Sequence, residues 1–266
     1  MKKLWFVSIF VFISVNTFPQ STKDKNQHHR VISNYSFEKG EKLKYLAYYG
    51  WVDAAEATLE LQENLYSING RPCYRAILKG RTIGMLDWAY SLRDTYESYI
   101  DQEALAPQKS IRDIKEGGYR YFDEVTYDHL NEKLFSKRNG ENKSVKYIQD
   151  VVSAFYFARC AIFENLSEGD TIFIETYFAD ENLKVVAKYL GKETIETDLG
   201  GFRCLKLMPL VEKGRIFEAQ DGVIAYISDD NNFIPIRVES DLWLGSFKFD
   251  LIEYSGLRNK MAIVER

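Results

Sequence analysis

The sequence predicts an all-β fold: a large antiparallel meander curled into a half-barrel or barrel, with one helix near residues 150–163. Three observations predict this fold. Runs in which apolar and polar residues alternate recur along most of the chain, as half-buried β-strands require. Turn signals such as Asn69-Gly70 and Asn139-Gly140 separate several of these runs. Only one segment shows strong helical spacing of its apolar residues.

Six alternating runs occupy the first half of the chain. The first is the clearest, because Leu43, Tyr45 and Ala47 share one face before Gly50 ends the run. The six runs span residues 42–49, 55–63, 72–80, 88–100, 109–115 and 119–128. Since they are short and follow one another closely, an antiparallel meander is expected.

Helical spacing replaces the alternation in the middle of the chain. Val151 and Phe155 share one face of the predicted helix, and Asp150 is its candidate N-cap. We expect this helix to cover one opening or one face of the sheet. Arg159 lies on the otherwise apolar helix, and its side chain is expected to extend to solvent. The alternative is that Arg159 and Tyr156 reach into a cavity.

Six further runs complete the predicted sheet. They span residues 171–178, 184–190, 203–207, 222–227, 235–239 and 247–254. The sequence at residues 229–232, Asp-Asp-Asn-Asn, offers oxygen ligands for Ca²⁺ but lacks the spacing of an EF-hand loop. We interpret it as an acidic turn between two strands. The two halves of the chain are expected to form two lobes of one continuous sheet.

Residues 1–20 are predicted to be a secretory signal peptide. Lys2 and Lys3 precede an apolar run at residues 4–15, and a polar stretch with Pro19 follows. The run is short for a transmembrane helix, but no small-x-small cleavage site follows it, so an uncleaved anchor is the alternative. The first cysteine is Cys73, so the lipidated cysteine of a lipoprotein is missing. We expect an exported protein, periplasmic or outer-membrane-associated, that is not a lipoprotein and has no transmembrane span after cleavage.

Three parts follow the predicted signal peptide. Residues 21–36 are polar and aperiodic, which predicts a flexible leader. Residues 37–256 are predicted to form a single β-rich domain, because no shift in composition marks a linker. Residues 257–266 are predicted to be a C-terminal tail. The chain has 266 residues, of which 45% are hydrophobic and 28% charged, as is typical of a folded protein.

Net charge and aromatic content bear on the expected partners. The net charge of −4 gives no broadly basic surface, so nucleic acid is not an expected partner. Aromatic residues make up 15% of the chain. They favour strands, and they also line binding sites for sugars and amphiphiles. An amphiphile, a glycan or another envelope protein is therefore the expected partner.

The sequence lacks the residue patterns of several enzyme classes. His129 is the only histidine after residue 29, so we expect no zinc site and no Ser-His-Asp triad. The phosphate-binding and dinucleotide-binding glycine motifs are absent. We therefore expect no metal, no cofactor and no catalytic residue that can be named from a motif.

The three cysteines allow two interpretations. Cys73 and Cys204 both lie in strand-like runs, whereas Cys160 lies on the predicted helix. One possibility is a Cys73–Cys204 disulfide with Cys160 as a leftover thiol. The other is that all three are buried free cysteines, which pack as small hydrophobic side chains.

An ordered set of segments resembles a known family. The set includes FEKGEKLKYLAYYGWVDAAEATLEL near the start, QDVVSAFYFARC on the predicted helix and ISDDNNFIPIRVES near the end. In this order they are similar to domain-of-unknown-function family 3108 (DUF3108), a set of exported bacterial envelope proteins. The resemblance extends over nearly all of residues 37–254. It implies a β-rich exported protein and supplies no catalytic residues.

The segment 91–119 contains the dipeptide Arg-Asp twice and is predicted to be a hairpin. Strand periodicity places the two residues of each dipeptide on opposite faces. We therefore predict two structural cross-strand ion pairs, Asp94 with Arg112 and Arg93 with Asp113. The alternative is a charged ligand-binding site on the aromatic face. Its residues would be Trp88, Tyr90, Asp94, Tyr96 and Arg112.

These observations favour a non-catalytic exported envelope protein that binds a lipid, a glycan or a protein partner. The alternative is an enzyme that acts on envelope glycan through paired carboxylates, because a glycosidase requires only two suitably spaced carboxyl groups. Absence of the histidine, thiolate and nucleotide motifs favours the non-catalytic protein over the enzyme.

Overall fold

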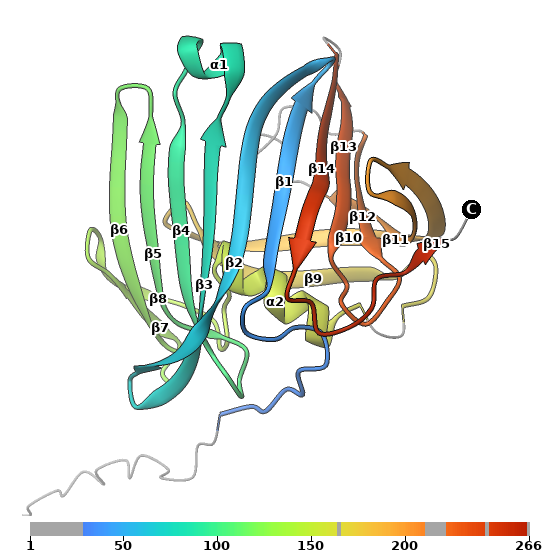
Figure 1. Cartoon of the computed structure of the whole chain (residues 1–266). Helices are drawn as coiled ribbons and strands as arrows, with labels where there is room; N and C mark the ends of the chain where they lie inside the picture. Colours follow the sequence, from blue (N-terminus) through green and yellow to red (C-terminus); the bar gives the residue numbers. More distant parts are fainter. Residues whose placement is uncertain (1–28, 164–165, 211–221, 243–244, 265–266) are drawn as a thin grey trace, which may run out of the picture.

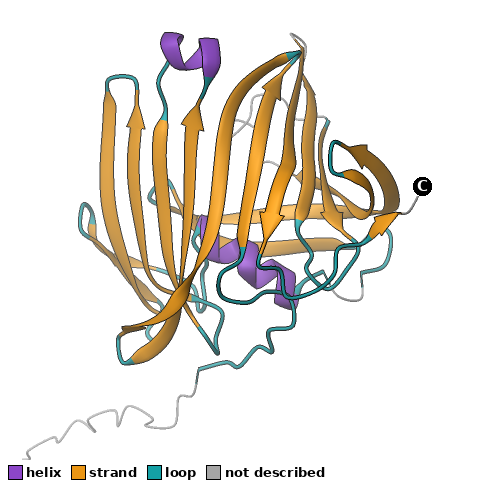
Figure 2. Ribbon diagram, in the orientation of Figure 1, coloured by secondary structure: helices purple, strands orange, loops and turns teal. Residues whose placement is uncertain are grey.

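A computed structural model describes residues 29–163, 166–210, 222–242 and 245–264 of the chain. The predicted signal peptide at residues 1–20 and residues 21–28 of the predicted leader lie outside the described residues. Strands make up most of the described chain, and two helices accompany them (Figure 2).

Fifteen strands form a single sheet (Figure 1). Eight precede the long helix α2 (Val151–Ala161): β1 (Lys42–Tyr49), β2 (Val52–Ile68), β3 (Arg71–Thr82), β4 (Arg93–Asp101), β5 (Pro107–Glu116), β6 (Tyr119–Asp128), β7 (Lys133–Ser136) and β8 (Gly140–Lys143). Seven follow it: β9 (Thr171–Phe178), β10 (Glu181–Thr197), β11 (Gly200–Leu210), β12 (Val223–Ser228), β13 (Pro235–Leu242), β14 (Gly245–Ser255) and β15 (Ile263–Val264).

The topology confirms the predicted antiparallel meander. The sheet order is β8-β7-β6-β5-β4-β3-β2-β1-β14-β13-β12-β11-β10-β9, and β15 pairs with β11 off this path. The strands before α2 therefore form one meander, and β9 to β14 form a second. The antiparallel β1–β14 pair joins the two meanders into one sheet. This arrangement agrees with the expected two lobes of a continuous sheet.

The sheet curls around α2, which lies on its concave side (Figure 1). The curl is not closed by strand pairing between β8 and β9. Side chains connect its two ends instead. At the β9–β10 turn, Asp180 accepts hydrogen bonds from Arg112 Nη2 (2.8 Å) and the Tyr121 hydroxyl (2.9 Å), and Asn182 Nδ2 donates to the Lys143 carbonyl (3.0 Å).

The predicted helix is confirmed, and its first turn has an N-cap made by its own sequence. The Asp150 carboxylate accepts hydrogen bonds from the backbone N–H groups of Val152 (2.8 Å) and Ser153 (2.9 Å). The Ser153 hydroxyl accepts in return from the Asp150 N–H (2.8 Å), which completes a capping box. The helix therefore begins where the sequence predicts.

A short second helix was not predicted. Residues 88–90 were expected at the start of a strand, but α1 (Gly84–Ala89) occupies the β3–β4 connection and β4 begins at Arg93. The Asp87 carboxylate accepts a hydrogen bond from the Thr82 hydroxyl (2.8 Å), and Arg93 Nη1 also donates to it (2.7 Å). These bonds draw the two strand ends together, so the connection folds into a helical turn rather than extending.

The main hydrophobic core lies between the concave face of the sheet and α2. It is contributed by the inward residues of the alternating strands and by the apolar side of the helix. Its fully buried members include Phe37, Leu61, Ile100, Tyr156, Phe202 and Ile236.

The leader and the tail are more ordered than the sequence predicts. Arg30 Nε donates to the Ala104 carbonyl (2.8 Å), and the Ile32 N–H donates to the Glu103 carbonyl (2.8 Å). Residues 30 and 32 of the predicted leader therefore contact the β4–β5 connection. The C-terminal segment also packs on the sheet, because the Ala262 N–H donates to the Asp230 carboxylate (2.7 Å) and β15 pairs with β11.

Replacing Gly256 with alanine is expected to lower the free energy of unfolding by about 1–3 kcal/mol. Gly256 has a φ of 65°, and an added Cβ would lie 2.4 Å from the carbonyl oxygen of Gly40. Urea unfolding measures this loss. Gly70→Ala is the matched control, because its φ is 73° but nothing lies within 4 Å of an added Cβ. An equal loss in the two variants would show that the contact with Gly40 contributes nothing.

Candidate functional site

The predicted Asp94–Arg112 ion pair is wrong. The β4–β5 register pairs Tyr96 with Arg112, so Asp94 lies further along the strand on the same face. The Asp94 carboxylate accepts a hydrogen bond from the Lys115 N–H (3.0 Å). Arg112 Nη2 instead forms an ion pair with Asp180 (2.8 Å), which the curl of the sheet brings within reach.

The predicted Arg93–Asp113 ion pair is also wrong, for the same reason of register. Asp113 lies opposite Thr95. Arg93 Nη1 pairs with Asp87 of α1 (2.7 Å), and the Asp113 carboxylate pairs with Lys115 Nζ (2.7 Å).

The structure does not bring the five predicted ligand-binding residues to one place. Trp88 lies on α1 and is 90% exposed. The Tyr90 hydroxyl lies 3.3 Å from Glu116 Oε2. Tyr96 and Arg112 do lie together, against the N-terminus of α2, but the cavity there is only about 20 Å³. That volume holds about one water molecule, so it is too small for an organic ligand.

Two carboxyl groups meet on the same face as Tyr96. Burial raises the pKa of Asp94, and the neighbouring Glu116 carboxyl, within hydrogen-bonding reach, raises it further. A glycosidase needs its two carboxyl groups about 5–10 Å apart, with a sugar or a water molecule between them. Groups that can hydrogen-bond directly leave no such space. Asp94 and Glu116 therefore do not have the geometry of a glycosidase pair.

The cysteines correspond to the second interpretation, except that Cys160 is only partly buried. Cys73, Cys160 and Cys204 are all free thiols, and Cys73 and Cys204 are fully buried. Cys73 lies on β3 and Cys204 on β11, and these strands are not neighbours in the sheet. The predicted Cys73–Cys204 disulfide is therefore wrong. Burial raises the pKa of each of these two thiols to about 12, so neither is a reactive thiolate near neutral pH.

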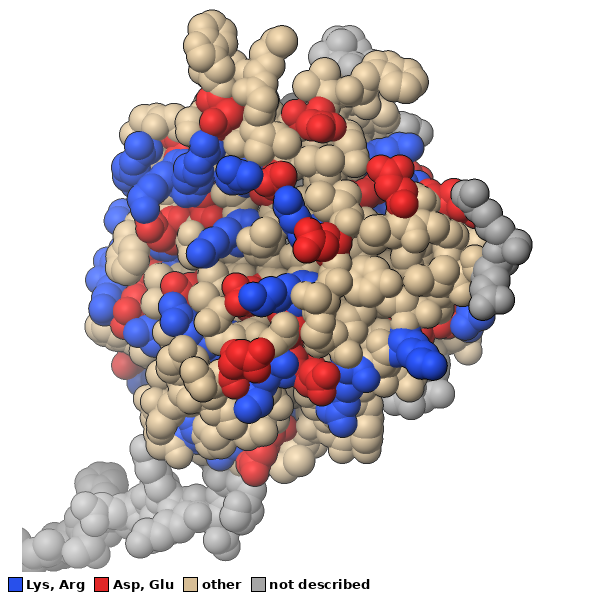
Figure 3. Space-filling view, in the orientation of Figure 1, with Lys and Arg blue, Asp and Glu red and all other residues tan. Residues whose placement is uncertain are grey.

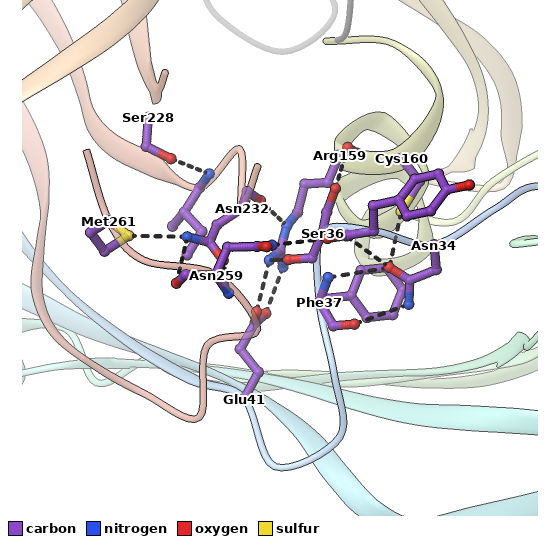
Figure 4. A network of polar contacts seen from close by, with 12 residues as sticks. Asn34, Ser36, Phe37, Glu41, Arg159, Cys160, Ser228, Asn232, Asn259 and Met261 are labelled. Carbon is purple, nitrogen blue, oxygen red and sulfur yellow. Dashed lines mark hydrogen bonds and ion pairs between the residues drawn. The ribbon is translucent and has the colours of Figure 1, made fainter. Parts of the chain in front are cut away.

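A buried ion pair joins α2 to the segment that precedes β1 (Figure 4). Both side chains of the pair, Arg159 and Glu41, are fully buried. Arg159 Nη1 and Nη2 donate to the two oxygens of Glu41 (2.5 and 2.7 Å). Nε donates to the Asn232 carbonyl (2.6 Å), and Nη2 also donates to the Ser36 carbonyl (2.9 Å). The expectation that Arg159 extends to solvent is therefore wrong.

The position of this pair indicates a structural role. Its partners come from the N-terminal segment, α2 and the β12–β13 turn, and the side chain of Asn232 also accepts a hydrogen bond from the Asn259 N–H (3.0 Å). The network therefore fixes α2 to both ends of the described chain. It has no open space for a ligand among the cavities lined by described residues.

A cavity of about 510 Å³ lies at the end of the sheet opposite α1. This is within the range of small-ligand sites. Its walls are the β2–β3 turn, the start of β5, the end of β6 and the β7–β8 hairpin. The cavity is lined mainly by polar and aromatic side chains: His29, Asn69, Arg71, Gln108, Tyr127, Asp128, His129, Lys133, Phe135 and Glu141 among them.

Gln108 and His29 both line this cavity, and each has a buried side-chain nitrogen without a hydrogen-bond partner among the described residues. The Gln108 side chain is 3% exposed, and Oε1 accepts a hydrogen bond from Asn69 Nδ2 (3.2 Å). The amide nitrogen Nε2 is buried and has no hydrogen-bond partner in the part of the chain that the structure describes. A buried donor without a partner costs about 1–3 kcal/mol, so a ligand acceptor that reached it would be favoured.

The neighbouring groups are held in defined states. His129 Nε2 lies 2.6 Å from the Pro107 carbonyl, to which it donates, and burial lowers the pKa of His129 to about 4. The imidazole is therefore neutral near pH 7. The Tyr127 ring stacks on it, with the ring centroids 5.7 Å apart. Lys133 Nζ pairs with Glu141 (2.6 Å) at the edge of the cavity.

Sequence reasoning missed this cavity. Asn69-Gly70 is a turn signal, and Gln108, beside Pro107 at the start of a strand, belongs to no motif. His129 was considered only for catalysis. A useful signal would have been the strand periodicity that places Gln108 on the face of Ile114, and His129 on the face of the buried Val125 and Tyr127.

Metal-ligating side chains and the length of the helices also bear on what the site can do. The described residues contain no group of three or more His, Cys, Asp or Glu side chains that could hold a metal ion. Within the same residues, neither helix is both long and apolar enough to cross a membrane.

Comparisons with known proteins give a family and a fold. The model of DUF3108, described as a protein of unknown function, matches residues 44–252. No protein among those with curated descriptions matches the chain. A β-barrel-like protein of the DUF1849 family from Brucella abortus is similar over 86% of this chain and 99% of its own, with a TM-score of 0.52 and 8% identity. This similarity shows the fold alone.

Two weaker similarities involve other bacterial structures. A DUF1089-family protein from Pseudomonas aeruginosa has a TM-score of 0.39 and 13% identity, over 68% of this chain and 87% of its own. A protein from Bacteroides fragilis, taken to be exported and to have a YmcC-like fold, has a TM-score of 0.36 and 9% identity. That match covers 85% of this chain and 99% of the other.

Proposed function

From the premise that this chain belongs to the DUF3108 family of proteins of unknown function, we propose that it is a non-catalytic exported envelope protein that binds a glycan. The observation that carries the proposal is the unpartnered Gln108 amide in the wall of a ligand-sized cavity. The proposal of export rests on the basic and apolar pattern of residues 1–20, and the proposed location is periplasmic or outer-membrane-associated. The position of the first cysteine, Cys73, supports a protein that is not a lipoprotein.

The lining of the cavity selects for a hydroxyl-rich or amide-bearing ligand. Gln108, Asn69 and Arg71 supply planar hydrogen-bonding groups, which match sugar hydroxyls and acetamido groups. The rings of Tyr127 and Phe135 supply apolar faces on which a sugar ring can pack. A lipid chain would bury these polar groups without partners, so the lining disfavours an acyl chain.

The test is ligand-observed NMR of the protein with a panel of oligosaccharides that contain N-acetylglucosamine, glucose or galactose. At least one oligosaccharide is expected to bind. Gln108→Leu, which keeps the volume and removes the amide, is expected to weaken that binding about tenfold. Gln102→Leu is the matched control, because Gln102 is an exposed residue of the β4–β5 turn. Failure of the whole panel to bind would contradict the proposal.

The alternative function is an enzyme that acts on envelope glycan through paired carboxylates. The pair on this chain would be Asp94 and Glu116, whose close approach does not suit glycoside hydrolysis. The same samples distinguish the two functions. New reducing ends in the incubated oligosaccharide, lost in Asp94→Asn, would favour the enzyme.

A further inference from the structure

Large apolar side chains are exposed together at the end of the sheet opposite the cavity. We call them the aromatic rim: Trp51 in the β1–β2 turn, Met85 and Trp88 on α1, and Tyr119 at the start of β6. Trp51 is fully exposed, Trp88 is 90% exposed and Met85 79%. Figure 1 shows α1, the β1–β2 turn and the β5–β6 turn at the same end of the sheet. Figure 3 shows uncharged side chains projecting there. Exposed tryptophans at this density mark an interaction surface.

A row of basic side chains lies directly beneath the rim, on the convex face. Register places Arg81 opposite Arg93 across β3 and β4, and Lys115 opposite Arg120 across β5 and β6. The Thr95–Asp113 pairing places Arg93 beside Lys115, so the four residues run across four adjacent strands. We call them the basic row. Figure 3 shows Lys and Arg gathered over this part of the sheet.

Like charges directly opposite each other destabilise a sheet, so the basic row needs an explanation. Acidic neighbours offset part of the charge: Glu56 pairs with Arg81, Asp87 with Arg93 and Asp113 with Lys115. Arg120 has no acidic partner among residues 29–163, 166–210, 222–242 and 245–264, and its Nη1 donates to the Gly117 and Tyr119 carbonyls. Three of the four charges of the row are therefore paired, and Arg120 supplies the one positive charge next to the rim that no acid of the described residues offsets.

A shallow hollow of about 320 Å³ opens between these cations on the outer face. Three residues of the basic row, Arg81, Arg93 and Lys115, line it together with Lys79 and the hydroxyl-bearing Thr58 and Thr95, and the carboxyl groups of Glu56 and Asp94 also lie in its wall. Cations and hydroxyl groups converging on an open hollow suit a phosphate group. The hollow lies beside the aromatic rim, so a phosphate group bound in it would lie next to the exposed apolar side chains of the rim.

We propose that the aromatic rim and the basic row dock this protein on the surface of a membrane that contains anionic phospholipid. Tryptophan and tyrosine rings favour the boundary between headgroups and acyl chains, and basic side chains favour anionic headgroups. The chain as a whole carries a net charge of −4, so the basic row is the part of this end that an anionic surface would attract. The cavity at the other end then faces away from the membrane.

The test measures whether the rim itself enters a bilayer. In a Trp5→Phe/Trp243→Phe background, Trp51 and Trp88 are the remaining tryptophans of the full chain. Their emission is expected to be quenched by vesicles of brominated phosphatidylcholine and phosphatidylglycerol, and not by vesicles without phosphatidylglycerol. Quenching is expected to weaken as salt is raised, because salt screens the basic row.

Variants separate the rim from other membrane contacts. Lys115→Gln/Arg120→Gln is expected to lower the vesicle partition coefficient at least tenfold, since each basic residue near an anionic surface contributes about fivefold. Trp51→Ser/Trp88→Ser is expected to lower it at least tenfold in co-sedimentation. The controls are Phe173→Ser, an aromatic residue on β9 that is 52% exposed, and Lys188→Gln on β10.

Three results would overturn the proposal. They are vesicle binding without quenching of Trp51 and Trp88, equal binding by the rim variants and the controls, and binding of free phosphate with no binding to vesicles. The first would assign membrane binding to another segment, such as residues 4–15. The outcome is independent of the oligosaccharide experiment, because none of these substitutions lies in the wall of the cavity.

Discussion

Replacing Arg159 with methionine is expected to lower the free energy of unfolding by about 3–5 kcal/mol. The substitution leaves the Glu41 carboxylate fully buried without its cation, since both side chains have no exposed surface. It also removes the donors that satisfy the carbonyl groups of Asn232 and Ser36. Urea or guanidinium unfolding followed by circular dichroism measures the loss.

A double replacement distinguishes the pair from the packing around it. Arg159→Met/Glu41→Leu removes both charges, and replacing a buried pair with apolar residues is often nearly neutral. It is therefore expected to recover most of the stability lost in Arg159→Met, with a large coupling energy in the double-mutant cycle. Arg203→Met is the matched control, because the Arg203–Asp229 pair has an arginine that is 56% exposed and should cost less than about 1 kcal/mol. Equal losses in Arg159→Met and Arg203→Met would contradict the buried-pair interpretation.

The second large expected effect is a pH dependence of the free energy of unfolding, which originates at Asp150, the N-cap of α2. Burial raises the pKa of Asp150 to about 6, against the hydrogen bonds from Ser98, Ser153 and Val152 that lower it. In the unfolded chain an aspartate titrates near pH 4. Between these two values the folded state binds more protons than the unfolded state, so stability falls as the pH rises from about 4 to about 6.

The pH dependence can be measured as the difference in unfolding free energy between the wild type and an Asp150 variant. The shift corresponds to about 3 kcal/mol, and Asp150→Asn is expected to remove that dependence while keeping the capping acceptor for the N–H groups of Val152 and Ser153. Unfolding free energies of the two proteins, measured from pH 4 to pH 7, are expected to diverge in favour of the variant as the pH rises. A constant difference across this range would contradict the raised pKa.

Asp101 provides a control of opposite sign. Burial raises its pKa, but hydrogen bonds from Arg71 and the N–H groups of Ala104 and Glu103 outweigh burial and lower the pKa below its usual value. The stabilisation by Asp101 is therefore complete above about pH 4, and it is lost as the pH falls through the folded pKa. Asp101→Asn should accordingly show a difference from the wild type that is flat from pH 4 to pH 7.

Local patterns predicted the secondary structure well because their causes are local. Alternation places Leu43 and Tyr45 on one side of the sheet whatever pairs with β1, and both are buried. The Asp150 N-cap depends only on residues two and three positions further along the chain. Helix α1 was missed because its start depends on the contact of Asp87 with Thr82 and Arg93 across a strand connection.

Predictions of specific contacts failed where they depended on register or on curvature. Strand parity correctly placed Asp94 and Arg112 on the same face, but the register shifted them apart along the strands. Arg112 instead forms an ion pair with Asp180, which lies sixty-eight positions away in sequence. The candidate site was missed for the same reason, because Asn69 and Gln108 meet only once β2 to β5 have paired.

The sequence by itself determined the antiparallel meander, the position of α2 and the resemblance to the family, because periodicity and ordered segments depend on neighbours along the chain. Tertiary structure alone decided that Arg159 is buried against Glu41, that the cysteines stay apart, and that a cavity and an aromatic rim lie at opposite ends of the sheet. Each of these features depends on how residues that are distant in sequence are placed relative to one another. Their contacts depend on strand register and on the curl of the sheet, and one residue of slip in register reverses the face of every side chain on a strand.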